Sequence, residues 1–323
     1  MTARTPLFIV GIQRSGTSLV REVLRNHPLI ALTHAETNLL PALARKLERT
    51  KPLHTQSDFS QISRWTRRFP YFRHLESKEI EFTNEAWFGA CERLDAAGIF
   101  EAMARLDAGE VSETHRVWGD KSPAYRTELP LLARLFPGAH VLHVIRDVRD
   151  VCLSAQRAWG AHPLRTAQTW ANDIEACRAD SAELGDGHYL EVHYEALLHN
   201  PKHEFSTICQ FLDLEFSQDM LNLSNPVDPL GQTANAQEIV THNRDHWKEA
   251  FSSDTRAQIE NIAGTAMNTC GYPLEFGEAK AAPLSPAHLG ALRVRDGLYL
   301  LNHRRSRWGL LSALQRTAHA AFQ

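Results

Sequence analysis

The first apolar run of the chain spans residues 7–10, and a polar loop with two glycines follows it. A short, uninterrupted apolar run is typical of a strand that is buried on both faces of a parallel sheet. Beyond the loop, apolar residues recur with helical spacing over 19–24, and the pair His27-Pro28 ends this pattern because the residue before a proline avoids helical geometry. The pattern predicts a strand, a glycine loop and a helix in that order.

Three later apolar runs have the same character and predict strands at 29–32, 139–145 and 188–193. Helical spacing of apolar residues predicts helices at 85–96, 99–106, 128–136, 151–159, 165–184, 201–212 and 254–268. We expect Gly98 to separate the first two of these helices. Short strands that alternate with helices predict an α/β fold around a mainly parallel sheet.

Four segments do not fit the alternation. The stretch 51–116 is polar and aromatic and predicts a helical insertion or lid beside the sheet, whereas 117–123 has the composition of a compact polar turn. The stretch 222–245 is rich in Asn, Pro and Gly and predicts a long loop. We expect a main domain at 1–277 and, after a linker of small residues and prolines, a basic amphipathic helical extension at 278–323.

Composition narrows the class of protein. The 323 residues carry a net charge of -3, which argues against a general nucleic-acid binder because such domains have a basic excess. The five cysteines are widely spaced without a Cys-x-x-Cys pair, so neither a disulfide framework nor a zinc site is indicated and we expect no metal. Neither a leader nor a membrane-spanning run is apparent, and we expect a soluble, cytoplasmic protein without a transmembrane segment.

The glycine loop has the residue order of a phosphate cradle. Gly11 and Gly16 stand where the P-loop pattern places its glycines, and Ser18 stands at its final Ser/Thr position. Glycines let the backbone approach an anion, and the helix that follows points its first N–H groups at it. Thr17 replaces the P-loop lysine and Arg14 is the only cation, so the loop differs from that of a standard ATP or GTP user. An ordinary strand-to-helix turn is the alternative.

A second polar cluster follows the strand predicted at 139–145. It consists of Arg146-Asp147-Val148-Arg149-Asp150-Val151, with Ser154 on the helix that continues from it. Parallel sheets bind ligands outside the carboxyl ends of their strands, so we expect this cluster and the glycine loop to face one crevice. The alternative for Arg146 is a surface ion pair with a neighbouring aspartate.

Together these two motifs resemble the donor site of sulfotransferases, which use 3'-phosphoadenosine 5'-phosphosulfate (PAPS). The loop Gly11-Ile12-Gln13-Arg14-Ser15-Gly16-Thr17-Ser18 with Asn26-His27-Pro28 resembles their 5'-phosphosulfate loop, and the Arg146 cluster with Ser154 resembles their 3'-phosphate site. The branch with the tyrosylprotein and many bacterial enzymes is the most similar. Its further segments resemble Glu36-Thr37, Trp118-Gly119-Asp120-Lys121-Ser122-Pro123 and Val192-His193-Tyr194-Glu195-Ala196-Leu197. The resemblance covers residues 5–275.

The resemblance implies a P-loop-like three-layer fold and sulfuryl transfer from PAPS, which leaves as 3'-phosphoadenosine 5'-phosphate (PAP). It implies that Arg146 and Ser154 hold the 3'-phosphate and that Tyr194 contacts the adenosine half. The donor's 5'-phosphate would be held by loop residues Arg14, Ser15, Gly16, Thr17 and Ser18. Arg14 would also balance the charge that develops on the leaving phosphate.

The resemblance further implies two catalytic side chains beside Arg14. Glu36 matches the catalytic base of the tyrosylprotein enzymes, and burial can raise a carboxyl pKa enough for that role. Lys121 matches a lysine that lies near the sulfuryl group. Three other side chains are rival candidates for the base: His34, His115 and Asp120.

Two departures concern the substrates. The tyrosylprotein enzymes carry an arginine where this chain has Asn38, so we expect a hydroxyl or amine of a small molecule, lipid or glycan as acceptor rather than an acidic peptide. The cytosolic enzymes carry an Arg-Lys-Gly before a tryptophan, and here only Arg244 lies near Trp247.

Other functions and partners remain open from the sequence. A P-loop kinase or other phosphotransferase and a non-catalytic nucleotide-binding protein are the alternatives to a sulfotransferase. For the extension we expect packing on its own domain, with a homodimer contact, an acidic carrier protein or a peripheral membrane contact as alternatives.

Overall fold

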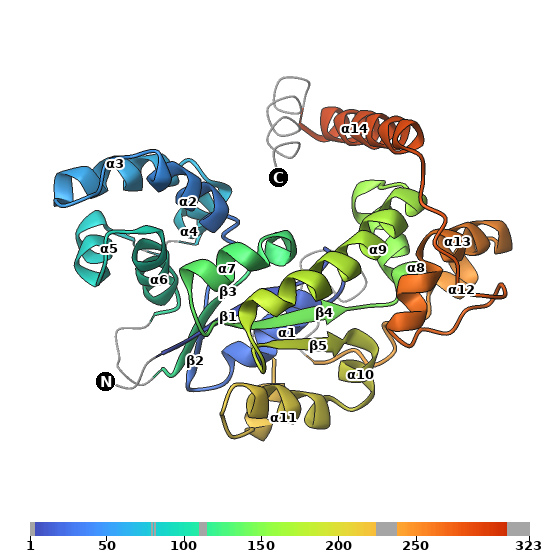
Figure 1. Cartoon of the computed structure of the whole chain (residues 1–323), viewed down its shortest axis with the longest axis horizontal. Coiled ribbons are helices and arrows are strands. Elements are labelled where there is room, and N and C mark those ends of the chain that lie inside the picture. The colour runs from blue at the N-terminus through green and yellow to red at the C-terminus, as the bar shows by residue number, and fades with distance from the viewer. Residues whose placement is uncertain (1–3, 79, 81, 110–114, 224–237, 309–323) are drawn as a thin grey trace.

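The computed structural model describes residues 4–78, 80, 82–109, 115–223 and 238–308. Within them lies one five-stranded sheet in the order β2-β3-β1-β4-β5, and all four strand pairings are parallel (Figure 1). The strands are β1 (Thr5–Val10), β2 (Ile30–Leu32), β3 (Val117–Lys121), β4 (His140–Ile145) and β5 (Tyr189–His193). β1 is central, so the glycine loop that follows it lies in the middle of the sheet's carboxyl edge.

Side chains of β1 alternate between two cores. Phe8 and Val10 belong to one buried cluster, whereas Leu7 and Ile9 belong to another on the opposite face. This alternation follows from the period of two along a strand, and an apolar residue at each position requires cover on both faces. The sheet is thus the middle layer of three, and the predicted α/β fold class is confirmed.

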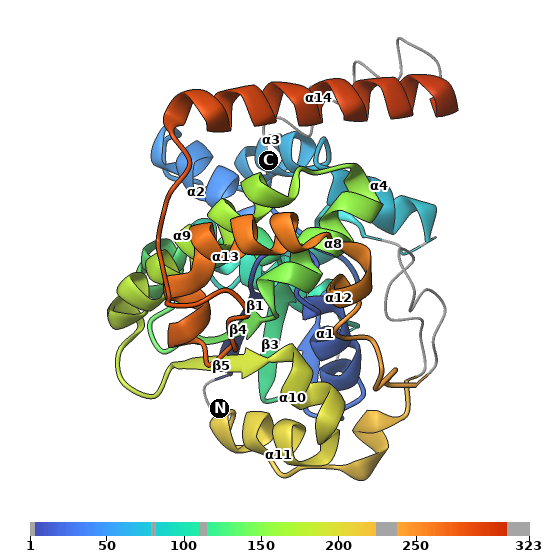
Figure 2. The same ribbon diagram turned by 90° about the vertical axis from the view of Figure 1, so that its right-hand side faces the viewer.

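Helices cover both faces of the sheet (Figures 1 and 2). Leu19 and Val20 of α1 pack in the cluster that contains Leu7, together with side chains of α10 and α11. The elements around this cluster are α1 (Thr17–Arg25), α10 (Tyr194–His199), α11 (Pro201–Phe211) and η3 (Gln218–Leu221). The elements on the way from β3 to β5 include η1 (Pro123–Thr127), α7 (Leu129–Leu135), α8 (Val148–Trp159), α9 (Pro163–Asp180) and η2 (Ser181–Leu184).

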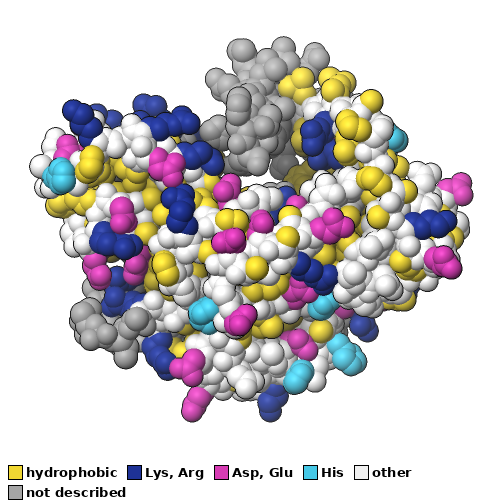
Figure 3. All heavy atoms as spheres, in the orientation of Figure 1, with side chains coloured by type: hydrophobic (Ala, Val, Ile, Leu, Met, Phe, Trp, Pro, Cys, Tyr) yellow, Lys and Arg dark blue, Asp and Glu magenta, His cyan; other side chains and the backbone are white. Residues whose placement is uncertain are grey.

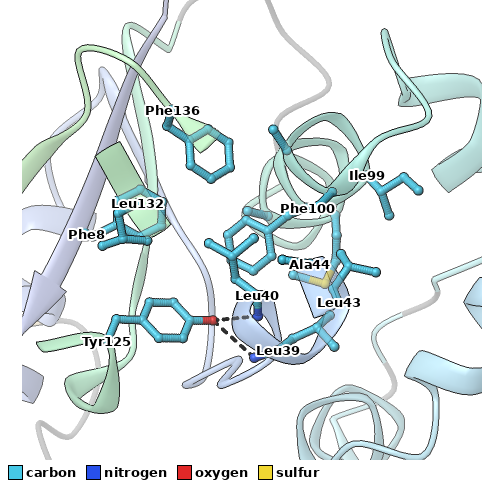
Figure 4. Close-up of a cluster of buried hydrophobic side chains, with 14 of the residues drawn as sticks. Phe8, Leu39, Leu40, Leu43, Ala44, Ile99, Phe100, Tyr125, Leu132 and Phe136 are labelled. Carbon is cyan, nitrogen blue, oxygen red and sulfur yellow. Dashed lines mark hydrogen bonds between the residues drawn. The ribbon is translucent and has the colours of Figure 1, made fainter. Parts of the chain in front are cut away.

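The chain between β2 and β3 is helical. It forms α2 (Leu40–Glu48), α3 (Gln56–Thr66), α4 (Pro70–Ser77), α5 (Asn84–Ala90) and α6 (Ala96–Asp107). α2 has no side-chain cap from its own N-terminal residue; instead the hydroxyl of Tyr125 accepts the N–H groups of Leu39 and Leu40 at 3.1 and 3.0 Å (Figure 4). The insertion therefore starts at α2, earlier than the 51–116 predicted from composition.

Two expectations were wrong. The predicted polar turn at 117–123 is largely β3, a buried inner strand, because its polar side chains find partners and Gly119 permits close pairing. A Cβ at Gly119 would lie 1.9 Å from the carbonyl oxygen of Leu7. Gly98 does not separate two helices but lies in the first turn of α6, where its N–H donates to the capping carboxylate of Asp95 at 2.8 Å.

The remaining helices lie toward the C-terminus. α12 (Trp247–Ala250) and α13 (Ser253–Thr269) share a third buried cluster with α8 and α9, and α14 (Pro286–Trp308) runs across the top of the molecule (Figure 2). Most of the loop predicted at 222–245, as well as residues 309–323 of the extension, lies outside the described residues. None of the described helices has the length and apolar character that crossing a membrane requires.

Candidate active site

The glycine loop needs its glycines for space as well as for conformation. Gly11 and Gly16 have φ angles of +148° and +100°, which L side chains rarely adopt. A Cβ at Gly11 would lie 2.6 Å from the carbonyl oxygen of Val144, and one at Gly16 would lie 2.2 Å from the ring of Tyr194. Within the described chain, α1 has no capping side chain and no acidic residue in its first turn. Its first N–H groups therefore suit an anion.

Arg14 connects the loop with α8. Its Nε donates to Oγ of Ser154 at 3.1 Å, and its guanidinium lies 5.7 Å from the ring centroid of Trp159. Arg14 itself has a positive φ of 76°, a conformation that costs energy in a non-glycine residue and is typical of functional loops. The structure thus joins two residues that are 140 positions apart. It also adds Trp159, which in the sequence is only an aromatic residue in a predicted helix.

Arg146, at the carboxyl end of β4, reaches the same place. The side chain is buried, donates to the backbone oxygens of Arg14 and Asn243 at 3.4 and 3.1 Å, and lies 3.8 Å from the carboxylate of Asp150. Its guanidinium also stacks on the ring of Tyr194, at 4.5 Å from the centroid. Arg146 is therefore not the surface side chain of the alternative interpretation.

Tyr194 completes this side of the site. Its ring lies against Gly16, and its hydroxyl accepts a hydrogen bond from Nδ2 of Asn243 at 2.8 Å. Burial raises the pKa of Tyr194, so the hydroxyl stays protonated at neutral pH. The sequence analysis missed Asn243, because a single asparagine in a polar loop forms no recognisable pattern.

Glu36 and Lys121 form an ion pair at the neighbouring strand ends. Nζ of Lys121 lies 2.6 Å from Oε1 of Glu36 and 3.4 Å from Oγ of Ser18, so this lysine connects the carboxylate with the loop. Lys121 is 3% exposed and Glu36 is 34% exposed, which leaves the carboxylate accessible to a ligand. Burial lowers the pKa of Lys121, and the carboxylate of Glu36 opposes that shift.

Asp120 does not face the site but connects the segment that carries Glu36 with the end of β3. Its carboxylate is fully buried and accepts hydrogen bonds from the hydroxyls of Thr33, Thr37 and Ser122 at 2.9, 2.5 and 2.8 Å. Burial raises its pKa, and these hydrogen bonds oppose the shift. Thr33 and Thr37 flank Glu36, so the carboxylate of Asp120 fixes the segment that carries Glu36 to the end of β3.

The other predicted residues lie elsewhere. His34 is held toward α6, since its Nδ1 lies 3.0 Å from Asp107 and its N–H donates to the same carboxylate at 2.7 Å. His115 precedes β3 and lies at the amino edge of the sheet, away from the loop. Arg244 is exposed and lines a separate cavity of about 310 Å³. Of the rival bases, none shares the ion pair of Glu36 and Lys121.

A large cavity of about 840 Å³ opens beside the loop. Ile12 and Gln13 of the loop and Asn38 line its inner end, whereas Asp296 and Leu300 of α14 line it from the opposite side. The walls between them come from α2, the end of α3, η1, α8 and α9. In the described part of the chain, no group of three or more His, Cys, Asp or Glu side chains is placed to hold a metal ion.

Comparisons with known proteins agree with this geometry. The model of the sulfotransferase family matches residues 6–218, which contain the glycine loop, Glu36, Lys121, Arg146 and Tyr194. A candidate protein-tyrosine sulfotransferase of Caenorhabditis briggsae is 26% identical over 281 residues, with 82% of this chain and 88% of that protein covered. Protein-tyrosine sulfotransferase 2 of Gallus gallus is 26% identical over 67% of this chain, which spans about half (53%) of the chicken protein.

A solved structure shows the same fold. The sulfotransferase domain of the Synechococcus PCC 7002 olefin synthase superposes with a TM-score of 0.55 at 24% identity and covers 85% of this chain and 97% of that domain. The family model matches well over half of the sequence, and this match identifies the family. The chain belongs to the sulfotransferase family of enzymes.

Proposed function

We propose that the protein transfers a sulfuryl group from PAPS to a hydroxyl or amine of its acceptor. The observation that carries this proposal is the meeting of the glycine loop with Arg146 and Ser154. Arg14 bonds to Ser154 at 3.1 Å, and Arg146 bonds to the backbone of Arg14 at 3.4 Å. The first N–H groups of α1 and two guanidinium groups therefore come together, which suits a nucleotide with phosphates at both ends of its ribose.

Two buried atoms support the fit of this donor. Oγ of Ser15 and Nε of Arg146 are buried, and neither has a hydrogen-bond partner among the described residues. A buried donor without a partner costs about 1 to 3 kcal/mol, so such atoms beside the glycine loop fit a bound anion. Phosphate oxygens would supply acceptors to both atoms.

The chain's own residues would act as follows. Arg14 and the first N–H groups of α1 would stabilise charge on the leaving phosphate, and Lys121 would stabilise charge near the group in transfer. Glu36 would take the proton from the acceptor, since its carboxylate is one-third exposed and lies 2.6 Å from Lys121. PAPS would supply the activated sulfuryl group.

We infer a small molecule, lipid or glycan as the acceptor, because the cavity of about 840 Å³ beside the loop has the size of a small-molecule site. A protein tyrosine is a second candidate, since several relatives are named protein-tyrosine sulfotransferases. Asn38 favours the first acceptor class over a protein tyrosine, because the tyrosylprotein enzymes have an arginine at this position and this chain lacks it.

Thermal unfolding in the presence of nucleotides tests the donor. PAP at a hundredfold excess over its Kd should add about 2.7 kcal/mol to the free energy of unfolding, and ATP with Mg²⁺ should add much less. A preference for ATP with Mg²⁺ would favour the phosphotransferase alternative and contradict the proposal. The cytoplasmic location, the domain bounds and the homodimer contact stay predictions.

A further inference from the structure

We propose that the large cavity beside the loop is the acceptor site, that α14 forms one of its walls, and that it selects an acceptor with an apolar or aromatic body and an anionic group. This inference rests on the sulfuryl transfer proposed above. It adds the chemical class of the acceptor and a specificity role for a helix outside the residues that the family model matches.

The inner end of the cavity lies next to the proposed reacting centre. Ile12 and Gln13 belong to the loop that would hold the phosphosulfate, and Asn38 follows Glu36 by two residues. The N–H of Asn38 donates to Ser122 at 3.1 Å, so the inner end of the cavity is fixed to the corner that carries Lys121. A molecule in this cavity would place one end beside the glycine loop and Asn38, two residues after Glu36, while its body extends outward between the helices.

α14 is fastened to the opposite wall. The N–H of His162 donates to both carboxylate oxygens of Asp296 at 3.1 Å, and Nε of Arg165 lies 2.6 Å from the same carboxylate. The ring of Tyr299 lies so close to Gly160 that a Cβ there would be 2.0 Å away. Asp296 is only 4% exposed, and Leu300, one turn later, lines the cavity. These contacts make α14 part of the wall.

The walls combine aromatic and other apolar side chains with polar ones. Trp65 and Phe69, which lie at and just after the end of α3, form one side, and Trp159 of α8 forms another. Their rings offer flat apolar surfaces, on which an aromatic or aliphatic body is held by burial rather than by hydrogen bonds.

An unpaired positive charge stands among these apolar groups. Arg68 lines the cavity and is exposed, and no carboxylate among the described residues forms an ion pair with it. Arg45 lies 4.0 Å from Glu128 and is 61% exposed, so its pairing is weak. The other two arginines in the wall, Arg126 and Arg165, each form an ion pair with a carboxylate, at 2.5 and 2.6 Å. An anionic group on the acceptor would complete the pairing of Arg68.

The surface around the cavity also carries an excess of positive charge. Residues 40–78 contain nine Lys and Arg against three Asp and Glu, although the whole chain carries a net charge of -3. Figure 3 shows Lys and Arg side chains gathered over the region of α2 and α3. Such a local field attracts an anionic acceptor and raises its concentration near the cavity.

Matched acceptors and matched variants test the inference. The full chain saturated with PAP would be titrated calorimetrically with 6-hydroxy-2-naphthoate, which is anionic, and with 2-naphthol, which is neutral and otherwise similar. The wild type should bind the naphthoate about tenfold more tightly. Arg68→Gln should remove this preference, and Arg64→Gln, at an exposed position four residues earlier, should keep it.

The role of α14 is tested in the same titrations. Leu300→Trp should weaken the binding of both naphthyl compounds about tenfold, because the larger side chain fills the cavity. Leu300→Ala should weaken their binding by a smaller factor. Leu298→Trp, on the face where Leu298 is 62% exposed, should change neither affinity. PAP should bind all variants equally.

The outcomes separate this inference from the proposed function. If PAP does not bind the wild type, the proposed function fails. If PAP binds but Arg68→Gln behaves like Arg64→Gln, the anionic class is wrong. If both Leu300 variants behave like Leu298→Trp, α14 is not a wall of the site. Binding of an acidic tyrosine peptide without binding of the naphthoate would likewise overturn the inference.

Discussion

The two halves of the site are built in different ways. After their proposed roles, we call the glycine loop with Arg146, Ser154 and Tyr194 the donor half, and Glu36, Lys121 and the large cavity the acceptor half. The donor half stands on loops at the ends of β1, β4 and β5, and backbone geometry determines its shape. The acceptor half is assembled from the helical insertion, η1, α8, α9 and α14, and packing between distant segments determines its shape.

This difference explains which part of the site tolerates substitutions within one fold. Backbone groups that hold phosphates depend on a few glycines and on a helix N-terminus, so they tolerate little change. A cavity between helices changes with each side chain in its walls. We therefore expect substitutions in the donor half to affect PAP binding, and substitutions in the acceptor half to affect transfer and acceptor binding alone.

The largest expected effect belongs to Glu36. Glu36→Gln keeps an oxygen for Lys121 but removes the proton acceptor, and transfer to 2-naphthol should slow by about 10² to 10⁴. Single-turnover release of PAP from PAPS measures this rate, and PAP affinity should stay unchanged. Glu85→Gln, at an exposed position of α5, is the control. Near-normal transfer by the Glu36 variant would remove Glu36 as the base.

Asp120 tests how the acceptor half is held. Asp120→Ala removes the carboxylate that three buried hydroxyls share as an acceptor and should lower the free energy of unfolding by about 3 kcal/mol. Asp120→Asn should cost less because it keeps one oxygen. Urea unfolding measures both, and Asp186→Ala, at an exposed position, should lie within about 0.5 kcal/mol of the wild type. An Asp120→Ala variant as stable as this control would contradict the assigned role.

Acid should lower the free energy of unfolding through a buried histidine of β4, the strand that leads to the donor half. His143 of β4 is 1% exposed, and burial lowers its pKa from 6.5 to about 4, against an opposing effect of Glu191. Between these values the unfolded chain binds a proton that the folded chain does not, so stability is lost as pH falls from about 6.5 to 4, by up to about 3 kcal/mol. Unfolding of His143→Gln should depend less on pH over this window, and exposed His199→Gln should behave as the wild type. Identical pH profiles for His143→Gln and the wild type would refute this.

Gly16 separates the effect of conformation from the effect of space. Gly16→Ala and Gly187→Ala both place a side chain at positive φ, which should cost about 1 to 2 kcal/mol in each, and the close approach to Tyr194 should add to the cost of Gly16→Ala alone. Only Gly16 faces the ring of Tyr194, whereas a Cβ at Gly187 meets nothing within 4 Å. Calorimetry should therefore show at least about tenfold weaker PAP binding for Gly16→Ala alone. Equal PAP affinity in both variants would show that Tyr194 does not contribute to the donor half.

The sequence predicted that the glycine loop and the Arg146 cluster meet, because the signals of both motifs are local. The glycines, the apolar strand before them and the cluster after 139–145 are each contiguous, and the structure joins them through the bond from Arg14 to Ser154. The inner strand β3 was missed because Asp120 and Lys121 look exposed in sequence, whereas hydroxyl groups and Glu36 satisfy them in the fold. Buried polar residues of this kind depend on tertiary partners, which a local pattern does not contain.

The acceptor half was less predictable for the same reason. The aromatic residues of 51–116 indicated a lid, but not that Trp65 and Phe69 would face Trp159 across a cavity. For the extension, a helix and packing on the domain were expected. Leu292 is buried in the third cluster, and Asp296 adds polar contacts with His162 and Arg165. Leu298 of the same helix is 62% exposed.

Calorimetric titration with PAP and with adenosine 5'-phosphate, which lacks only the 3'-phosphate, tests the central claim most directly. The wild type should bind PAP about 10- to 150-fold more tightly, the equivalent of about 1.5 to 3 kcal/mol for charged hydrogen bonds. Arg146→Ala should bind the two nucleotides equally, and Arg157→Ala, at an exposed position of α8, should keep the preference. Equal affinities in the wild type, or a preference that survives Arg146→Ala, would contradict the account.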